Sequence, residues 1–403
     1  MHILAVSDYI LEDGVICGAT RVLHGYLNEL HRRGAVISLI TLANPPFQKF
    51  EALKPNYTIH RVTRRFSIAQ EIDILTACKT ACQDTSVDLC IGHLPFSARY
   101  IALRRYYKSH PLYAAPFIYI FHSPWHLEFE NRISYSQSIL HRLWRPIGGF
   151  LRRDGEKTVV LRADNIIVLS NYMKQLLTKT HRSFIDYKPI GKKTKVIPPG
   201  VDCEQFFPGD KKNARKTLNL PKDRLIAFTA RSLIHRCGIS LALQAMAKVK
   251  MRHPEWLLLI AGEGPLQKQL EEESKYLALT KNVQFPGNLS QEKLTLYYQA
   301  ADLFLLPTIE LEGFGLVILE AWASGLPVLG TPIGAIPEVL SPITPEFILE
   351  DCTPDTMFAS LQKIADKPNE LFATGKKCYE YVTKHYSWSK STDQLLTLFQ
   401  QKP

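Results

Sequence analysis

The sequence that decides the fold runs from Leu303 to Leu329 and reads Leu-Phe-Leu-Leu-Pro-Thr-Ile-Glu-Leu-Glu-Gly-Phe-Gly-Leu-Val-Ile-Leu-Glu-Ala-Trp-Ala-Ser-Gly-Leu-Pro-Val-Leu. Its apolar runs predict a strand over 303–307 and a helix over 316–324, joined by a short acidic loop. Gly313 and Gly315 remove side chains where the backbone turns into the helix. Exposed amides and the positive end of the helix therefore offer a site for an anion such as a diphosphate.

Two glutamates flank this turn. Glu312 stands just before the predicted helix, and Glu320 lies about two turns further along at 1.5 Å per residue. A structural alternative is that both simply favour the first turns of a helix. Burying an acid on an apolar helix costs several kcal/mol without a partner, which favours a binding role for Glu320. Two carboxylates at this spacing could accept hydrogen bonds from the hydroxyl groups of a sugar and of a ribose in one ligand.

The same alternation of predicted strands and helices continues in both directions along the chain from this stretch. Alternating strands and helices imply crossover connections and parallel sheets. A polar and then Pro/Gly-rich segment at 192–202 is typical of a linker. The predicted strands are 3–7, 36–42, 89–92, 117–122 and 166–170 in the first half, and 225–230, 256–261, 283–287, 303–307, 327–331 and 347–349 in the second. The predicted helices include 19–33, 239–250, 266–277, 291–299, 316–324 and 354–366.

The length of 403 residues is comfortable for two domains of ordinary size. We therefore predict an α/β protein with two doubly wound, Rossmann-like domains that face a cleft. Ligands in such sheets bind beyond the carboxyl ends of the strands.

The pattern Glu312-Gly-Phe-Gly-Leu-x-x-x-Glu320-Ala-x-Ala-x-Gly-x-Pro-Val resembles the signature of the retaining glycosyltransferases of family 4, which have the GT-B fold. Other landmarks fall in the family's order, and the resemblance is strongest over 196–341. They are Ile197-Pro-Pro-Gly-Val-Asp202, Ile260-Ala-Gly262-Glu-Gly264-Pro265, Val283-x-Phe285-x-Gly287 and Tyr386-Ser-Trp388. The resemblance implies an acceptor-side domain over 1–195, a nucleotide-sugar-binding domain over 196–380, and a helix over 381–403 that crosses back to the first domain.

The resemblance also implies roles for single residues. Glu312 and the amides of the following turn would hold the donor sugar and diphosphate, Glu320 would bind the ribose hydroxyls, and His122 would face the donor sugar. Gly18 matches a glycine-rich loop near the phosphates, although Cys17 replaces the usual first glycine. The implied donor-binding set is Gly18, Gly262, Val283, Gly287, Gly313, Phe314, Gly315, Leu316 and Glu320.

The loop after the strand at 225–230 departs from the family. The family presents an Arg and a Lys to the diphosphate, whereas Ser232 and Cys237 occupy those positions here. Arg231 and Arg236 each lie one residue earlier. Because the leaving-group charge must be neutralised, we expect Arg231 or Arg236 to serve by a changed side-chain path. The alternative is that both are solvated loop cations and the enzyme is slow or inactive.

The implied function is retaining transfer of a sugar from a nucleotide diphosphate donor, expected to be a UDP-sugar, to a hydroxyl of a glycan, glycolipid or small molecule. The sequence contains no Asp-x-Asp motif, so neither a metal nor another cofactor is expected. Retention without a well-placed nucleophile favours a front-face reaction. Two alternatives stay open: an acceptor-independent nucleotide-sugar hydrolase or epimerase, and a catalytically inactive nucleotide-sugar-binding subunit of a partner transferase.

The net charge of +11 is confined to the first half. Residues 1–200 hold 27 Lys and Arg against 15 Asp and Glu, whereas the rest of the chain holds 22 against 23. This favours an anionic membrane surface or acceptor as a partner, and the absence of a recognised module argues against nucleic acid. The segment 140–153 interleaves cations with Trp144 and Phe150, as interfacial segments do, but Pro146 and the following Gly pair are expected to interrupt a helix there.

The beginning of the chain is predicted to be a buried strand rather than a signal peptide, because Asp8 comes too early. No stretch approaches the roughly 20 apolar residues of a membrane-spanning helix. The eight cysteines contain no Cys-x-x-Cys pair, so reduced, mostly buried thiols are expected. Together these features predict a cytoplasmic protein with peripheral contact to the inner membrane face.

Overall fold

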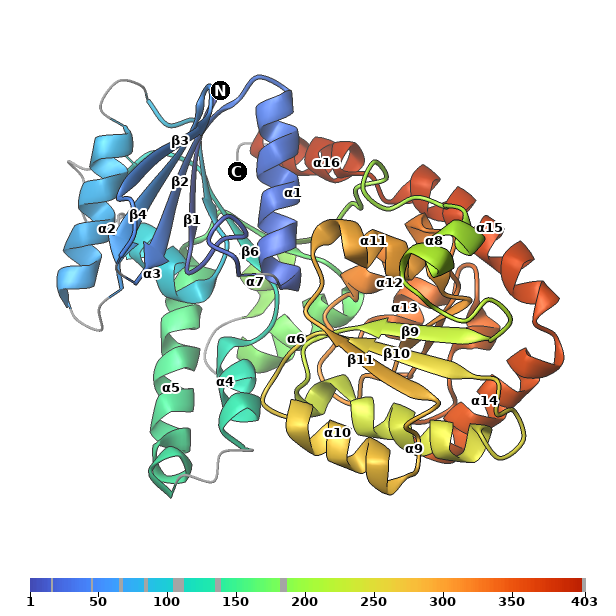
Figure 1. The fold of residues 1–403 in the computed structure, drawn as a ribbon. Helices are drawn as coiled ribbons and strands as arrows, with labels where there is room; N and C mark the ends of the chain where they lie inside the picture. The colour runs from blue at the N-terminus through green and yellow to red at the C-terminus, as the bar shows by residue number, and fades with distance from the viewer. Residues whose placement is uncertain are drawn as a thin grey trace. The chain divides into compact units, whose positions relative to one another are not determined.

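The computed structural model describes all residues except 16, 45, 65–67, 83–85, 104–111, 135–138, 182–186 and 401–403. It divides the chain into two compact units. The first unit contains Met1–Gly200 together with Trp388–Pro403, and the second contains Val201–Ser387. The chain therefore passes twice between the units, and the two connections are bridged at Val201 and Ser387. Figure 1 shows the elements of each unit.

The first unit is built on an eight-stranded sheet in the order β3-β4-β2-β1-β5-β6-β7-β8. Every neighbouring pair is parallel except β3 and β4, which form an antiparallel edge. The central strands are buried along their whole length, as expected for a parallel sheet covered on both faces. The strands are β1 (His2–Ser7), β2 (Val36–Ala43), β3 (Phe50–Lys54), β4 (Tyr57–Thr63), β5 (Leu89–Gly92), β6 (Phe117–Phe121), β7 (Asn165–Val168) and β8 (Thr194–Val196).

One helix of the first unit comes from the far end of the chain. Helix α16 packs against α1 (Figure 1). The contact is close because Gly25 of α1 has no side chain: a Cβ there would lie 2.2 Å from the ring of Trp388. The helices of this unit are α1 (Gly18–Arg32), α2 (Ile68–Ala81), α3 (Pro95–Leu103), α4 (Trp125–Ser134), α5 (Ile139–Arg162), α6 (Asn171–His181), α7 (Tyr187–Lys193) and α16 (Trp388–Gln400).

The second unit has a parallel five-stranded sheet in the order β11-β10-β9-β12-β13. Its strands are β9 (Ile226–Ala230), β10 (Leu257–Ala261), β11 (Val283–Gly287), β12 (Leu303–Leu306) and β13 (Val328–Gly330). Its helices are α8 (Lys211–Thr217), α9 (Ile239–Val249), α10 (Gln267–Tyr276), α11 (Gln291–Ala300), α12 (Leu316–Ala323), α13 (Ile336–Leu340), α14 (Pro354–Asp366) and α15 (Asn369–His385). Both units thus have the doubly wound arrangement that the alternating pattern predicted.

Two predictions about elements were wrong, and a third was right only in part. The strand expected over 347–349 is reduced to one isolated parallel bridge between Ile348 and Gly330, because the chain before it, including Phe347, is wound into the 3-10 helix η3 (Pro345–Phe347). The linker expected over 192–202 is confirmed in part, because the boundary between the two units falls inside it, after Gly200, but its first residues form the end of α7 and the strand β8. The ammonium group of Lys193 donates hydrogen bonds to the carbonyl oxygens of Leu161 and Ala163, so this polar stretch is tied to the end of α5.

The second wrong prediction concerns α5, which runs through Pro146 without interruption. The glycines that follow serve close helix packing instead: a Cβ at Gly148 would lie 2.6 Å from the ring of Phe129 on α4. Glycine in this helix therefore lets two helices approach and does not end either of them.

Candidate functional site

The carboxyl edge of the second sheet gathers most of the predicted donor-binding residues. Arg231 follows β9, Gly262 follows β10, and Gly287 ends β11. The amide of Gly262 donates to the carbonyl oxygen of Gly287 over 2.8 Å, and that of Arg231 donates to Ala261 over 3.0 Å. Three neighbouring strand ends are thus joined by backbone hydrogen bonds at the edge where such sheets bind ligands.

The loop after β12 adds a carboxylate to this edge. The guanidinium of Arg231 donates from Nη2 to Glu312 Oε2 over 2.7 Å and from Nη1 to the hydroxyl of Thr308 over 2.7 Å. The Thr308 hydroxyl lies 3.3 Å from the same carboxylate oxygen, to which it donates. Both charged side chains are about nine-tenths buried, at 9% and 12% exposure. Residues far apart in the sequence therefore form one compact ionic cluster.

Both members of the pair are charged. Burial alone would raise the pKa of the Glu312 carboxyl, but Arg231 and Arg236 outweigh burial and hold it below its ordinary value. Burial alone would lower the pKa of the Arg231 guanidinium, but Cys237 and Glu312 raise it instead. A negative carboxylate beside a fixed cation can accept hydrogen bonds from ligand hydroxyls without first changing its protonation state.

The guanidinium of Arg236 contacts the backbone of the same loop. Its Nη1 donates to the carbonyl oxygen of Leu311 over 2.9 Å. Leu311 has a φ of 49°, an uncommon left-handed conformation for a leucine. The two arginines predicted as alternatives therefore have different tasks in this structure: Arg231 pairs with the Glu312 side chain, and Arg236 holds the backbone one residue before it.

Helix α12 begins as the sequence predicted. Its N-cap is Gly315 with φ 85°, and no side chain among the described residues caps its first turn. The first amides of a helix lack intrahelical partners, so this turn keeps the capacity to bind an anion. Phe314 is buried against the ring of Tyr386, whereas Gly313 and Leu316 are partly exposed.

Glu320 lies on the buried side of α12. Its side chain is 5% exposed, and its Oε2 accepts a hydrogen bond of 2.9 Å from the hydroxyl of Tyr298 on α11. Tyr298 is thus the partner that compensates part of the cost of burying this acid. The contact of Glu320 with ribose hydroxyls stays a prediction.

Val283 is the one predicted donor-binding residue of the second unit that lies away from this edge. It begins β11, is 6% exposed, and belongs to the hydrophobic core. Its place at the amino end of the strand separates it from Gly287 at the carboxyl end.

The predicted residues of the first unit lie at the carboxyl side of its own sheet. His122 directly follows β6, and Gly18 is exposed as the first residue of α1. The Nε2 atom of His122 lies 2.7 Å from Nε2 of His93, a buried residue that directly follows β5. Burial lowers the pKa of His122 to about 3, so its ring is neutral at neutral pH.

Sequence reasoning missed Thr308, Tyr298 and His93. A signal existed for His93, because it directly follows the predicted strand 89–92, much as His122 ends the predicted strand 117–122. No comparable signal existed for Tyr298, whose partner on α12 is fixed only by the packing of two helices.

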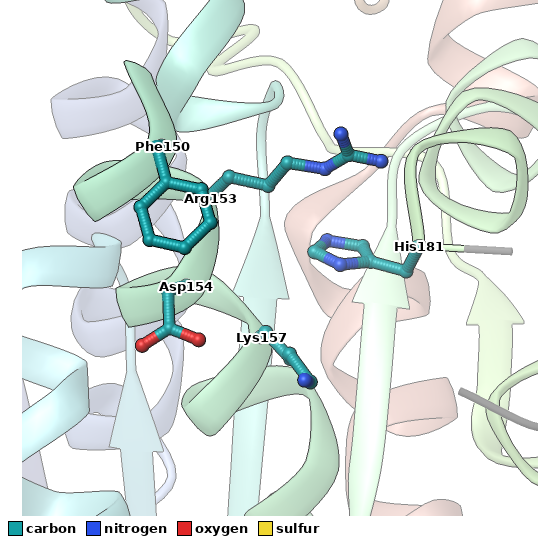
Figure 2. Close-up of a pocket in the computed structure, with 5 residues that line it drawn as sticks. All are labelled: Phe150, Arg153, Asp154, Lys157 and His181. Carbon is teal, nitrogen blue, oxygen red and sulfur yellow. The ribbon is translucent and has the colours of Figure 1, made fainter. Parts of the chain in front are cut away.

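A small pocket in the first unit lies outside the predicted sites. It is lined by Phe150, Arg153, Asp154, Lys157 and His181. Figure 2 shows the Arg153 guanidinium and the His181 ring on the same side, with the Asp154 carboxylate directed away from them. The pocket encloses about 20 Å³, which is room for one water molecule rather than for a sugar.

No group of three or more His, Cys, Asp or Glu residues in the described part of the chain could hold a metal ion. Within the same residues, no helix combines the length and the hydropathy that a membrane crossing requires.

Two family models match the chain in succession. The model described as Glycosyltransferase Family 4 matches residues 16–205, and the model described as Glycosyl transferases group 1 matches residues 210–385. Between them they cover most of both units, although not α16.

Two curated relatives and one solved structure extend the match. A D-inositol 3-phosphate glycosyltransferase of Segniliparus rotundus is 29% identical over 61% of this chain and 54% of its own. A GDP-mannose-dependent monoacylated alpha-(1-6)-phosphatidylinositol monomannoside mannosyltransferase of Corynebacterium glutamicum is 30% identical over 51% and 56%. The matches thus span about half the length of these relatives. Sucrose-phosphate synthase of Thermosynechococcus elongatus has a TM-score of 0.78 at 22% identity, covering 99% of this chain and 98% of its own, which establishes the GT-B fold.

Proposed function

Because the chain belongs to glycosyltransferase family 4, we propose that it transfers a sugar from a nucleotide diphosphate donor to a hydroxyl acceptor, with retention of anomeric configuration. The observation that carries the proposal is the Arg231–Thr308–Glu312 cluster at the carboxyl edge of the second sheet. It places a fixed negative charge and a fixed positive charge beside the uncapped start of α12.

The proposed roles follow from this geometry. The first amides of α12 bind the diphosphate, and Glu312 accepts hydrogen bonds from hydroxyls of the donor sugar. Arg231 keeps Glu312 ionised and, together with Arg236, supplies positive charge for the leaving group without a metal. The departing diphosphate oxygen takes the acceptor's proton while the sugar passes through an oxocarbenium-like state, so the protein contributes positioning and electrostatics.

The donor is testable without knowledge of the acceptor. We propose uracil as the base of the donor nucleotide, and guanine is the alternative because one relative is named as GDP-mannose-dependent. Melting temperatures would be measured with UDP, GDP, ADP and then with intact nucleotide sugars. Proton NMR of the reaction product would give the anomeric configuration. A product with inverted configuration would contradict the front-face mechanism.

Two other functions make distinct predictions in the same assays. A hydrolase or epimerase would consume the nucleotide sugar without any acceptor. An inactive binding subunit would bind a nucleoside diphosphate but show no turnover over a panel of glycan and lipid-linked acceptors.

We further propose that the first unit contacts an anionic membrane surface at the cytoplasmic face, where a lipid-linked acceptor would be presented. The supporting observation is an exposed apolar patch on α5, formed by Ile147, Phe150 and Leu151 at 54%, 62% and 59% exposure. These residues have the i, i+3, i+4 spacing that puts them on one helix face, and Phe150 lies beside Arg153 and Lys157 in the pocket of Figure 2.

Co-sedimentation with vesicles of phosphatidylglycerol and of phosphatidylcholine tests this surface. The wild type should bind the anionic vesicles, and the double variant Phe150→Ser, Leu151→Ser should lose at least about fivefold in binding. The control variant Tyr276→Ser, Phe372→Ser removes apolar side chains of the second unit that are even more exposed, at 89% and 80%, and should bind as the wild type does. Equal binding by both double variants would contradict the assignment of the surface to α5.

A further inference from the structure

An aromatic cluster inside the second unit contains one hydroxyl group that packing alone does not explain. The ring of Tyr298, on α11, packs against three phenylalanine rings with centroids 5.2 to 5.5 Å away, and Tyr298 is 1% exposed. The three rings belong to Phe206, Phe228 and Phe304. A buried hydroxyl costs free energy unless it finds a partner, so a fourth phenylalanine would serve the packing better.

The partner of this hydroxyl is the carboxylate of Glu320 on α12. The hydroxyl of Tyr298 donates to Oε2 of Glu320 over 2.9 Å, and Glu320 is 5% exposed. A tyrosine side chain turns about only two torsions, and here its ring is enclosed by other rings, so the hydroxyl keeps its direction. One oxygen of the carboxylate is therefore held from a fixed point on another helix.

Glu320 also stands in a fixed relation to the anion site at the start of α12. Gly315 is the N-cap of this helix, and five residues at 1.5 Å each place Glu320 about 7.5 Å further along its axis. A diphosphate bound by the first amides can thus extend its ribose toward Glu320. A carboxylate has about four acceptor positions, so the bond from Tyr298 leaves capacity for ligand hydroxyls. Both helices belong to the second unit.

We propose that Tyr298 is a positioning residue that sets how strongly the protein distinguishes ribonucleotides from deoxyribonucleotides. By holding Oε2 of Glu320, it orients the carboxylate so that the remaining acceptor positions meet the two hydroxyls of a ribose. The proposal rests on the proposed function, because only a nucleotide donor brings a ribose to Glu320. It narrows the donor class to sugars carried by ribonucleotides, since a deoxyribose would leave this buried acid with fewer hydrogen bonds.

Calorimetric titration of the full chain tests the proposal without any acceptor. The probes are whichever of UDP, GDP and ADP the wild type binds most tightly, and the same nucleotide with a 2′,3′-dideoxyribose. The wild type should prefer the ribonucleotide at least about tenfold, because hydrogen bonds to a charged carboxylate are lost with the dideoxyribose. In Tyr298→Phe this preference should fall about fivefold, while the Kd of the dideoxynucleotide stays within about twofold of the wild-type value.

Tyr297→Phe is the matched control. Tyr297 is the preceding residue on α11, is partly exposed, and stacks on Phe228 with centroids 5.6 Å apart. Removing its hydroxyl should leave the preference for the ribonucleotide unchanged. If Tyr298 only supported the fold, Tyr298→Phe would weaken the binding of both nucleotides alike, and this result would overturn the proposal. A preference in Tyr298→Phe equal to that in Tyr297→Phe would overturn it as well.

A Glu320→Ala background tests whether Tyr298 acts through Glu320. Glu320→Ala should by itself abolish the preference, and the addition of Tyr298→Phe should change it no further. A further loss of preference in the double variant would refute the positioning role. If no nucleotide binds the wild type, the proposed function fails and this inference fails with it. If nucleotides bind but Tyr298→Phe keeps the full preference, only this inference fails.

Discussion

At the scale of single residues, substitutions in the Arg231–Glu312 pair should change turnover and the free energy of unfolding to different extents. Replacing Glu312 by Gln leaves Arg231 buried without a counter-charge, which costs about 3–5 kcal/mol of unfolding free energy. Turnover should fall at least about 100-fold, because the ligand loses a fixed negative partner. Melting curves and the rate of nucleotide release measure the two effects.

A double variant controls for misfolding. Arg231→Met with Glu312→Gln removes both charges, so most of the stability should return while turnover stays low. Recovery of turnover in the double variant would refute the catalytic role of Glu312.

The lowered pKa of His122 predicts how the stability of the protein depends on pH. Its pKa of about 3 in the folded protein lies below the value of about 6.5 of an unfolded histidine. Between these values the unfolded chain binds more protons, so stability rises with pH by at most about 1.4 kcal/mol per pH unit from this group and is fully restored above pH 6.5. In His122→Asn the melting temperature should therefore change less between pH 4.5 and 7 than in the wild type, as measured by calorimetry. An unchanged difference would contradict the lowered pKa.

At the scale of elements, glycines set how closely the loops at the carboxyl edge of the second sheet approach one another. Gly238 and Gly287 have similar φ values of 68° and 73°, but a Cβ at Gly238 would lie 1.8 Å from the carbonyl oxygen of Pro307, whereas a Cβ at Gly287 would meet nothing within 4 Å. Gly287→Ala should cost about 1–2 kcal/mol for its backbone conformation alone. Gly238→Ala should lower the free energy of unfolding by more than about 4 kcal/mol, since its Cβ would clash with the backbone of Pro307, which cannot move aside as a side chain can. Chemical denaturation of the two variants compares them, and equal losses would contradict the steric explanation.

The sequence predicted the elements whose signals are local. The β12–α12 unit was predicted because an apolar run ends at Pro307 and a Gly-rich turn follows it. The β3–β4 edge was missed: β3 alternates between exposed and half-buried residues and carries little hydrophobic signal. Its turn signal was present, since Pro55 precedes Asn56, which has a φ of 60°.

The sequence could not show contacts that tertiary packing creates. Glu312 was identified from its motif, but its pairing with Arg231 joins segments 81 residues apart in the chain. The interruption expected at Pro146 was wrong for the same reason. The glycine pair that was expected to break the helix instead allows α4 to pack closely against α5 at Gly148. Local propensity is overridden where two elements meet.

At the scale of the whole molecule, α16 makes the first unit depend on residues from both ends of the described chain. In the wild type, Gly25→Ala would push a Cβ into the ring of Trp388 and should cost about 1–3 kcal/mol. In a Trp388→Ala background the same change meets no ring and should be neutral or stabilising, since alanine favours a helix by about 1 kcal/mol over glycine. The double-mutant cycle should give a coupling of about 1–4 kcal/mol by denaturation. Additive effects would show that α16 does not pack on α1 in solution.

Because a ribosome delivers a chain from its amino end, α1 emerges long before the indole that will cover Gly25 and Tyr26 has been synthesised. The segment 201–387 is contiguous and can complete its fold during translation. The first unit cannot complete its fold until α16 has been synthesised. A nascent chain halted before residue 388 would therefore display an uncovered apolar surface of α1 around Tyr26, of the kind that chaperones bind.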